Sequence, residues 1–165
     1  MEKGLLDLHN LLRWILLILL LLSIFKAYSG WKKKKVFSPG DRKTWLFTLI
    51  AAHTNLLIGL YLWLWGRFGM LKIPAPPEGV TKNKFYLFFW IEHPAMMILS
   101  VIMITLAYRV AKKTLPDSTK YARGLWLFIV APLAGAALAA LVYMAINSGE
   151  TVPDAANQAR KQTAA

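Results

Sequence analysis

The sequence contains no cysteine among its 165 residues. This absence excludes a disulfide framework, an iron–sulfur cluster held by thiolates, and a haem attached through a Cys-x-x-Cys-His motif. Any bound cofactor has to be held by other side chains, such as histidine, methionine or carboxylates. Acidic residues are also scarce, because eight Asp and Glu stand against 20 Lys and Arg, and the formal net charge is +12.

The basic residues do not indicate nucleic-acid binding, because they lie in short loops beside long apolar stretches. Hydrophobic residues make up 57% of the chain, and apolar stretches cover approximately residues 5–25, 45–65, 86–108 and 125–146. Each has about the 20 residues needed to cross a hydrocarbon core roughly 30 Å thick. The sequence therefore predicts an all-α membrane protein, with a four-transmembrane-helix up-down bundle over residues 1–147. We expect the polar, Ala-rich tail over residues 148–165 to be disordered.

The loops differ in their content of basic residues. The first and third loops, counted together with Lys26, carry twelve Lys and Arg, and the opposite side carries seven. The positive-inside rule places the more basic loops in the cytoplasm, so both termini of this multi-pass protein are expected outside. Trp45 and Tyr108 are expected among the aromatic residues at the inner interface. Loops of this charge are also suited to anionic lipid.

Polar and ionisable side chains inside the spans are the most informative feature, because such groups are costly in a bilayer and usually face partners within the bundle. All three histidines, His9, His53 and His93, fall inside the predicted spans. A four-helix bundle can build a cofactor site from inward-facing side chains, and haem iron accepts axial histidine. Hydrogen-bonded histidines with a purely structural role are the alternative interpretation.

His9 and His93 form the best-placed pair of haem ligands. Spans one and three are diagonal in an up-down bundle, and these two histidines differ in depth by about 3 Å at a rise of 1.5 Å per residue. His53 lies on the other side of the midplane, where span four offers only Leu133 and Ala134. Whether His53 is a ligand or a core residue stays open.

Arg13 and Glu92 also need partners inside the membrane. Either they pair with each other, or Arg13 binds a haem propionate and Glu92 relays protons for a quinol. Pro94 cannot donate a hydrogen bond to the carbonyl of Trp90, so a kink is expected there. This kink would aim the preceding residue, His93, inward. An interpretation in which the helix merely tolerates the proline, with no role in ligation, is equally supported.

Three strings around these residues, LHNLLRW from Leu8, AAHTNLLIGLYL from Ala51 and IEHPAMM from Ile91, resemble a family of small four-helix bacterial membrane proteins usually labelled cytochrome b. The resemblance covers roughly residues 5–108, and each histidine sits in a matching string. It implies non-covalent haem b and electron transfer in the bacterial cytoplasmic membrane. The leading hypothesis is therefore electron transfer between a quinol pool and a partner, such as a larger respiratory complex, with quinone as a further ligand.

Two other functions stay open. The fourth span is rich in Ala and Gly, and small residues let helices pack closely in lipid. The chain could therefore be a non-catalytic accessory subunit of a larger complex, with pigment binding through single histidines as a variant. A small proton-relay transporter would instead use Arg13, Glu92 and the histidines as its path. The scarcity of polar residues in the cytoplasmic half argues against such a path.

Overall fold

The described part of the chain forms four long helices. The computed structural model describes residues 2–77, 79–80 and 83–147, without the side chains of residue 132 and residues 134–147. The predicted tail over residues 148–165 lies outside this description. The first two helices are α1 (Glu2–Lys32) and α2 (Pro39–Trp65). The third runs through α3 (Lys84–Leu87), the π-helical turn η1 (Phe88–Glu92) and α4 (His93–Lys112), and the last is α5 (Asp117–Asn147).

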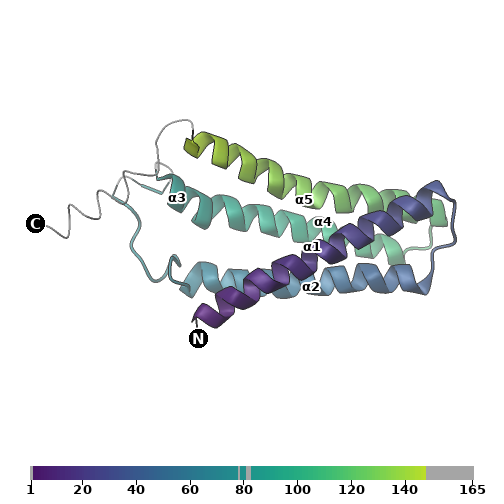
Figure 1. Cartoon of the computed structure of the whole chain (residues 1–165), viewed down its shortest axis with the longest axis horizontal. Coiled ribbons are helices and arrows are strands. Elements are labelled where there is room, and N and C mark those ends of the chain that lie inside the picture. The colour runs from purple at the N-terminus through teal and green to yellow at the C-terminus, as the bar shows by residue number, and fades with distance from the viewer. Residues whose placement is uncertain (1, 78, 81–82, 148–165) are drawn as a thin grey trace, which may run out of the picture.

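The long helices run alternately up and down, and their order around the bundle is α1, α2, α4, α5 (Figure 1). Because α5 packs against α1 and α2 packs against α4, the helices α1 and α4 face each other across the bundle. The predicted diagonal relation of spans one and three is confirmed. We call the end where α1 begins the histidine end, because His9 and His93 lie toward it. The opposite end, which holds residues 33–38 and 113–116, is called the basic end.

Three helices of the described chain are long and apolar enough to cross a membrane: α1, α2 and the continuous helix Lys84–Lys112. Their outer faces carry large apolar side chains, and in α1 Ile18 and Leu21 are 58% and 57% exposed. Lipid can cover such faces without breaking hydrogen bonds, because the backbone N–H and C=O groups of each helix bond to one another within the helix. For α5 the side chains of most of the apolar half lie outside the description, so the fourth span and its small residues remain predictions.

The buried core lies in the basic half of the bundle. Trp45 of α2 and Phe128 of α5 are completely buried, and their rings meet edge to face with centroids 5.1 Å apart. Gly124 allows this contact, because a Cβ at that position would collide with the Trp45 indole. Trp45 and Tyr108, which the sequence predicts at the inner membrane interface, both fill space between the helices, and their depth in a membrane stays a prediction.

The histidine half is packed differently. In α1 no residue from 2 to 19 is buried, and the first buried residue of this helix is Leu20. Over the same half of the third helix, Trp90 and Pro94 are the buried residues among residues 84–100. The described side chains thus hold the helices together mainly at the basic end.

Candidate functional site

His9 and His93 lie toward the histidine end, on the two helices that face each other across the bundle. His9 packs on α2, where its Cε1 atom would be 3.1 Å from a Cβ at Gly59. Because glycine has no Cβ, the imidazole approaches the α2 backbone closely. The His93 ring lies beside Phe88, with centroids 5.7 Å apart, and interacts electrostatically with His9. The structure therefore places the two histidines that the sequence pairs toward the same end of the bundle, on helices that face each other.

Four buried polar atoms in this half have no hydrogen-bond partner among the described residues. They are Glu2 Oε1 and His9 Nδ1 of α1, Asn55 Oδ1 of α2 and Glu92 Oε2, which lies next to His93 in the chain. Such an atom costs about 1–3 kcal/mol when it stays unpaired. Each unpaired polar group in a folded protein calls for an explanation, and functional sites are one of the usual ones. These atoms come from three helices and make this half of the bundle the candidate site.

His53 and Arg13 do not join this group. His53 is exposed on the outer face of α2, and its Nδ1 lies 3.0 Å from the Leu49 carbonyl of the same helix. Arg13 is also exposed, with its guanidinium carbon 5.5 Å from the centre of the Trp14 ring. Over the described residues, no ion pair joins Arg13 to Glu92. The ion pair predicted between Arg13 and Glu92 is thus absent from the described residues.

The helix turn before His93 is π-helical, where the sequence predicts only a kink. Pro94 has no N–H, so the Trp90 carbonyl four residues earlier loses its helical donor. The indole N–H of Trp63 on α2 donates to this carbonyl instead, at 3.0 Å. The Trp90 indole donates in turn to the carbonyl of Phe68, at 2.7 Å. The two indoles therefore attach the π-helical turn to α2 and to the segment that follows it. Turns of this kind are frequent at functional sites.

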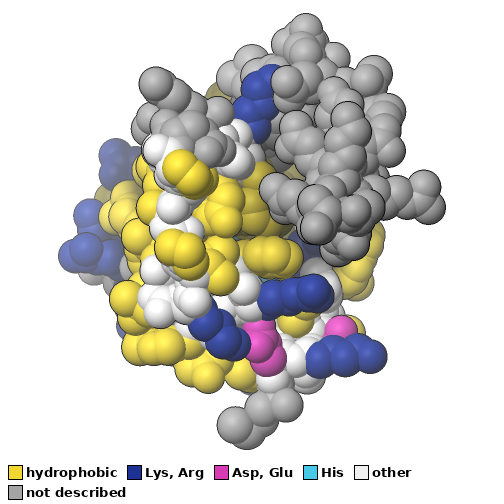
Figure 2. All heavy atoms as spheres, turned by 90° about the vertical axis from the view of Figure 1, so that its left-hand side faces the viewer, with side chains coloured by type: hydrophobic (Ala, Val, Ile, Leu, Met, Phe, Trp, Pro, Cys, Tyr) yellow, Lys and Arg dark blue, Asp and Glu magenta, His cyan; other side chains and the backbone are white. Residues whose placement is uncertain are grey.

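The outer surface of the histidine end carries charges of both signs among apolar side chains (Figure 2). Glu2 at the start of α1 forms an ion pair of 3.0 Å with Lys72, which lies in the segment between α2 and α3. Both side chains are exposed, so the pair contributes at most about 1 kcal/mol. It links the segment to α1 without closing the end of the bundle.

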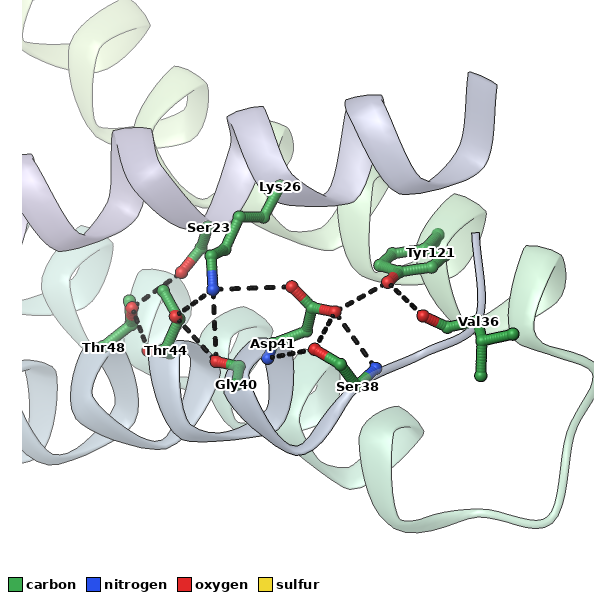
Figure 3. Close-up of polar contacts among 9 residues, drawn as sticks. All are labelled: Ser23, Lys26, Val36, Ser38, Gly40, Asp41, Thr44, Thr48 and Tyr121. Atoms are coloured by element: carbon green, nitrogen blue, oxygen red, sulfur yellow. Dashed lines mark hydrogen bonds and ion pairs between the residues drawn. The ribbon is translucent and has the colours of Figure 1, made fainter. Parts of the chain in front are cut away.

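A hydrogen-bond network that the sequence does not predict joins the helices at the basic end (Figure 3). Asp41, in the first turn of α2, is its centre. Its Oδ2 accepts hydrogen bonds from Ser38 Oγ at 2.6 Å and from the Tyr121 hydroxyl of α5 at 2.7 Å. Its Oδ1 lies 3.5 Å from Lys26 Nζ of α1. One carboxylate thereby connects α1, α2 and α5.

Part of this network has a signal in the sequence. Ser38 and Asp41 form a capping box at the start of α2, and a serine three residues before an acidic residue is typical of this motif. The link to Tyr121 has no local signal, because the tyrosine belongs to another helix. One turn deeper, the completely buried Ser23 and Thr48 share a hydrogen bond of 2.8 Å.

Asp41 precedes the apolar segment of α2, which begins at Trp45, so it lies outside the predicted span. Partial burial alone would raise its pKa, but the hydrogen bonds from Ser38 and Tyr121 and the charge of Lys26 lower the pKa overall. Burial and the hydrogen bond to the carboxylate raise the pKa of Tyr121. The tyrosine therefore keeps its proton and remains a donor at neutral pH.

Within the residues that the structure describes, no three His, Asp or Glu side chains gather so as to hold a metal ion. No protein-family model matches the chain, and no curated protein or solved structure shows significant similarity to it.

Proposed function

We propose that the chain is a four-span b-type membrane cytochrome that passes electrons between a quinol pool and a partner complex. His9 and His93 would be the axial ligands of a non-covalent haem b. The observation that carries this proposal is their approach from α1 and α4, the two helices that face each other across the bundle. Ligands on opposite helices can reach the two faces of a flat macrocycle.

The chemistry of the residues around the pair supports this proposal. The porphyrin supplies four nitrogen ligands, so the protein needs to supply only two, and a larger group of metal ligands is not required. A ligating imidazole is held best when its surroundings fix the ring, and His9 packs closely against the α2 backbone at Gly59. Haem b ligated by two histidines has no open iron site, so it supplies one-electron transfer rather than oxygen chemistry.

Two charged residues would complete the site. Arg13 follows His9 by four residues and so lies on the same side of α1, one turn further along. Its planar guanidinium matches a propionate carboxylate. Glu92 has a buried Oε2 atom without a partner, so this carboxylate is placed to take up the proton that a quinol releases when it is oxidised.

The proposed placement follows the charge of the loops. With the basic end in the cytoplasm and both termini outside, the histidine pair lies in the outer half of the bilayer. The outward-facing His53 is then an exposed helix residue that bonds its own backbone, and the proposal gives it no role in ligation.

The test is a reduced-minus-oxidised optical spectrum of the purified full chain and of three single variants. The haem band should be present in the wild type, absent in His9→Ala and His93→Ala, and unchanged in His53→Ala, which is the matched control. Circular dichroism checks that each variant is folded. A folded wild-type protein without a haem band, or a band lost in His53→Ala alone, contradicts the proposal.

The same experiment separates the other functions. A folded, colourless protein that co-purifies with a larger membrane complex supports an accessory subunit. A pigment extract that contains chlorophyll supports the pigment-binding variant. Proton flux in vesicles that disappears in a folded Glu92→Gln variant supports a proton-relay transporter.

A further inference from the structure

A pocket of about 410 Å³ opens at the basic end, between the start of α2, the end of α4 and the start of α5. This volume lies within the range of roughly 300–1,000 Å³ that small-ligand sites occupy. Its walls combine apolar and cationic side chains. The residues that matter here are Phe37, Leu46, Tyr108, Arg42, Lys43 and Lys120.

The lining carries positive charge only. Arg42 and Lys43 are exposed, and neither has an ion-pair partner in the described part of the chain. Lys120 lies 3.9 Å from an Asp117 carboxylate oxygen, at the edge of ion-pair distance. The nearest acidic residue in α2, Asp41, does not line the pocket, because its two oxygens face the network of Ser38, Tyr121 and Lys26. No carboxylate lines the pocket, and Arg42 and Lys43, unlike Lys120, have no acidic neighbour at ion-pair distance in the described residues.

The apolar and cationic parts are ordered along the helix axes. Leu46 lies three residues further into α2 than Lys43, which is about 4.5 Å at the helical rise. Tyr108 lies four residues, or about 6 Å, before the end of α4 at Lys112, which does not itself line the pocket. The cations thus lie toward the end of the bundle and the apolar wall lies toward the spans. A phospholipid has the same order, with its phosphate at the membrane surface and its chains below.

We propose that this pocket binds the headgroup phosphate of an anionic phospholipid. Arg42 and Lys43 contact the phosphate, and Leu46 and Tyr108 contact the upper part of the acyl chains. Basic pockets between transmembrane helices are suited to anionic headgroups, and a guanidinium offers paired donors to phosphate oxygens. The lipid is favoured over a soluble anion because half of the wall is apolar and continues into helix faces that require a membrane.

The experiment uses the full chain in detergent and compares bound phosphatidylglycerol with bound phosphatidylcholine by native mass spectrometry. The wild type should retain phosphatidylglycerol preferentially. Each cation near an anionic headgroup changes affinity by about fivefold, so Arg42→Gln with Lys43→Gln should weaken it roughly 30-fold. The control Lys33→Gln with Lys113→Gln removes the same charge from the basic end outside the pocket and should retain the lipid. The charge-preserving Arg42→Lys with Lys43→Arg should retain most of it.

Three outcomes would overturn the proposal. An equal loss in the control pair would assign the lipid to the general charge of the basic end. Displacement of phosphatidylglycerol by millimolar inorganic phosphate would assign the pocket to a soluble anion. Absence of any preference in a wild type that unfolds cooperatively would leave no site. The unfolding temperature of each variant in phosphatidylcholine alone shows whether a lost preference reflects lost folding.

Discussion

The hydrogen bond from the Trp63 indole to the Trp90 carbonyl can be tested by removing its donor. Trp63→Phe keeps an aromatic ring but removes the indole N–H that donates to the Trp90 carbonyl. This carbonyl already lacks the backbone donor at position 94, because proline has no N–H. A buried acceptor without a partner costs about 1–3 kcal/mol, and measured hydrogen bonds between membrane helices average about 0.6 kcal/mol, with a maximum near 1.7. We therefore expect Trp63→Phe to lower the free energy of unfolding by about 1–2 kcal/mol.

A second substitution separates the hydrogen bond from the lost indole volume. Pro94→Ala restores a backbone N–H that can donate to the Trp90 carbonyl. In this background, Trp63→Phe should lose only packing, and the coupling energy between the two substitutions should be about 1 kcal/mol. The assay is unfolding of the four proteins by sodium dodecyl sulfate in mixed micelles, followed by circular dichroism. Equal costs of Trp63→Phe in both backgrounds would refute the reasoning.

Three further predictions concern the basic half. Gly124→Ala places a Cβ against the buried Trp45 indole and should destabilise the fold by about 1–3 kcal/mol; an unchanged unfolding temperature would contradict this. Because the folded state lowers the pKa of Asp41, its stabilising effect is present above its ordinary pKa of about 4 and is lost as the pH falls through the lowered value. Asp41→Asn should therefore remove this acid-dependent loss of unfolding temperature, and a variant as acid-sensitive as the wild type would exclude the effect. Ser23→Ala should lower the free energy of unfolding by about 1 kcal/mol because Thr48 loses a partner. The double variant Ser23→Ala with Thr48→Val should lower it by less than the sum of the two single variants. Strictly additive unfolding energies would argue against the hydrogen bond.

The sequence predicts the helices and the histidine pair because both follow from spacing. An apolar stretch of about 20 residues has the length of a membrane span, and alternate up and down spans place the first and third across the bundle. His9 and His93 lie at similar depths in those two spans. Their relation therefore depends only on chain order and helical rise, which are local properties.

The features that the sequence does not predict depend on contacts between distant residues. An aromatic residue beside a basic loop fits an interface as well as a core, and Gly124 in another helix decides that Trp45 is buried. Pro94 predicts a lost donor, but the replacement donor belongs to α2. The orientation of His53 depends on the rotation of α2 relative to its neighbours, which a pattern of nearly continuous apolar residues leaves undetermined.

The connection of α1, α2 and α5 through Asp41 also has a mechanical consequence. From Thr44, beside that junction, to Gly59 the chain of α2 rises by about 22 Å. A change of roughly 5° in the angle between α1 and α2 about the junction would therefore separate the two helices by about 2 Å at Gly59. The His9 ring rests directly against α2 at that level. Small changes in crossing angle thus decide whether this imidazole touches the neighbouring backbone or stands clear of it.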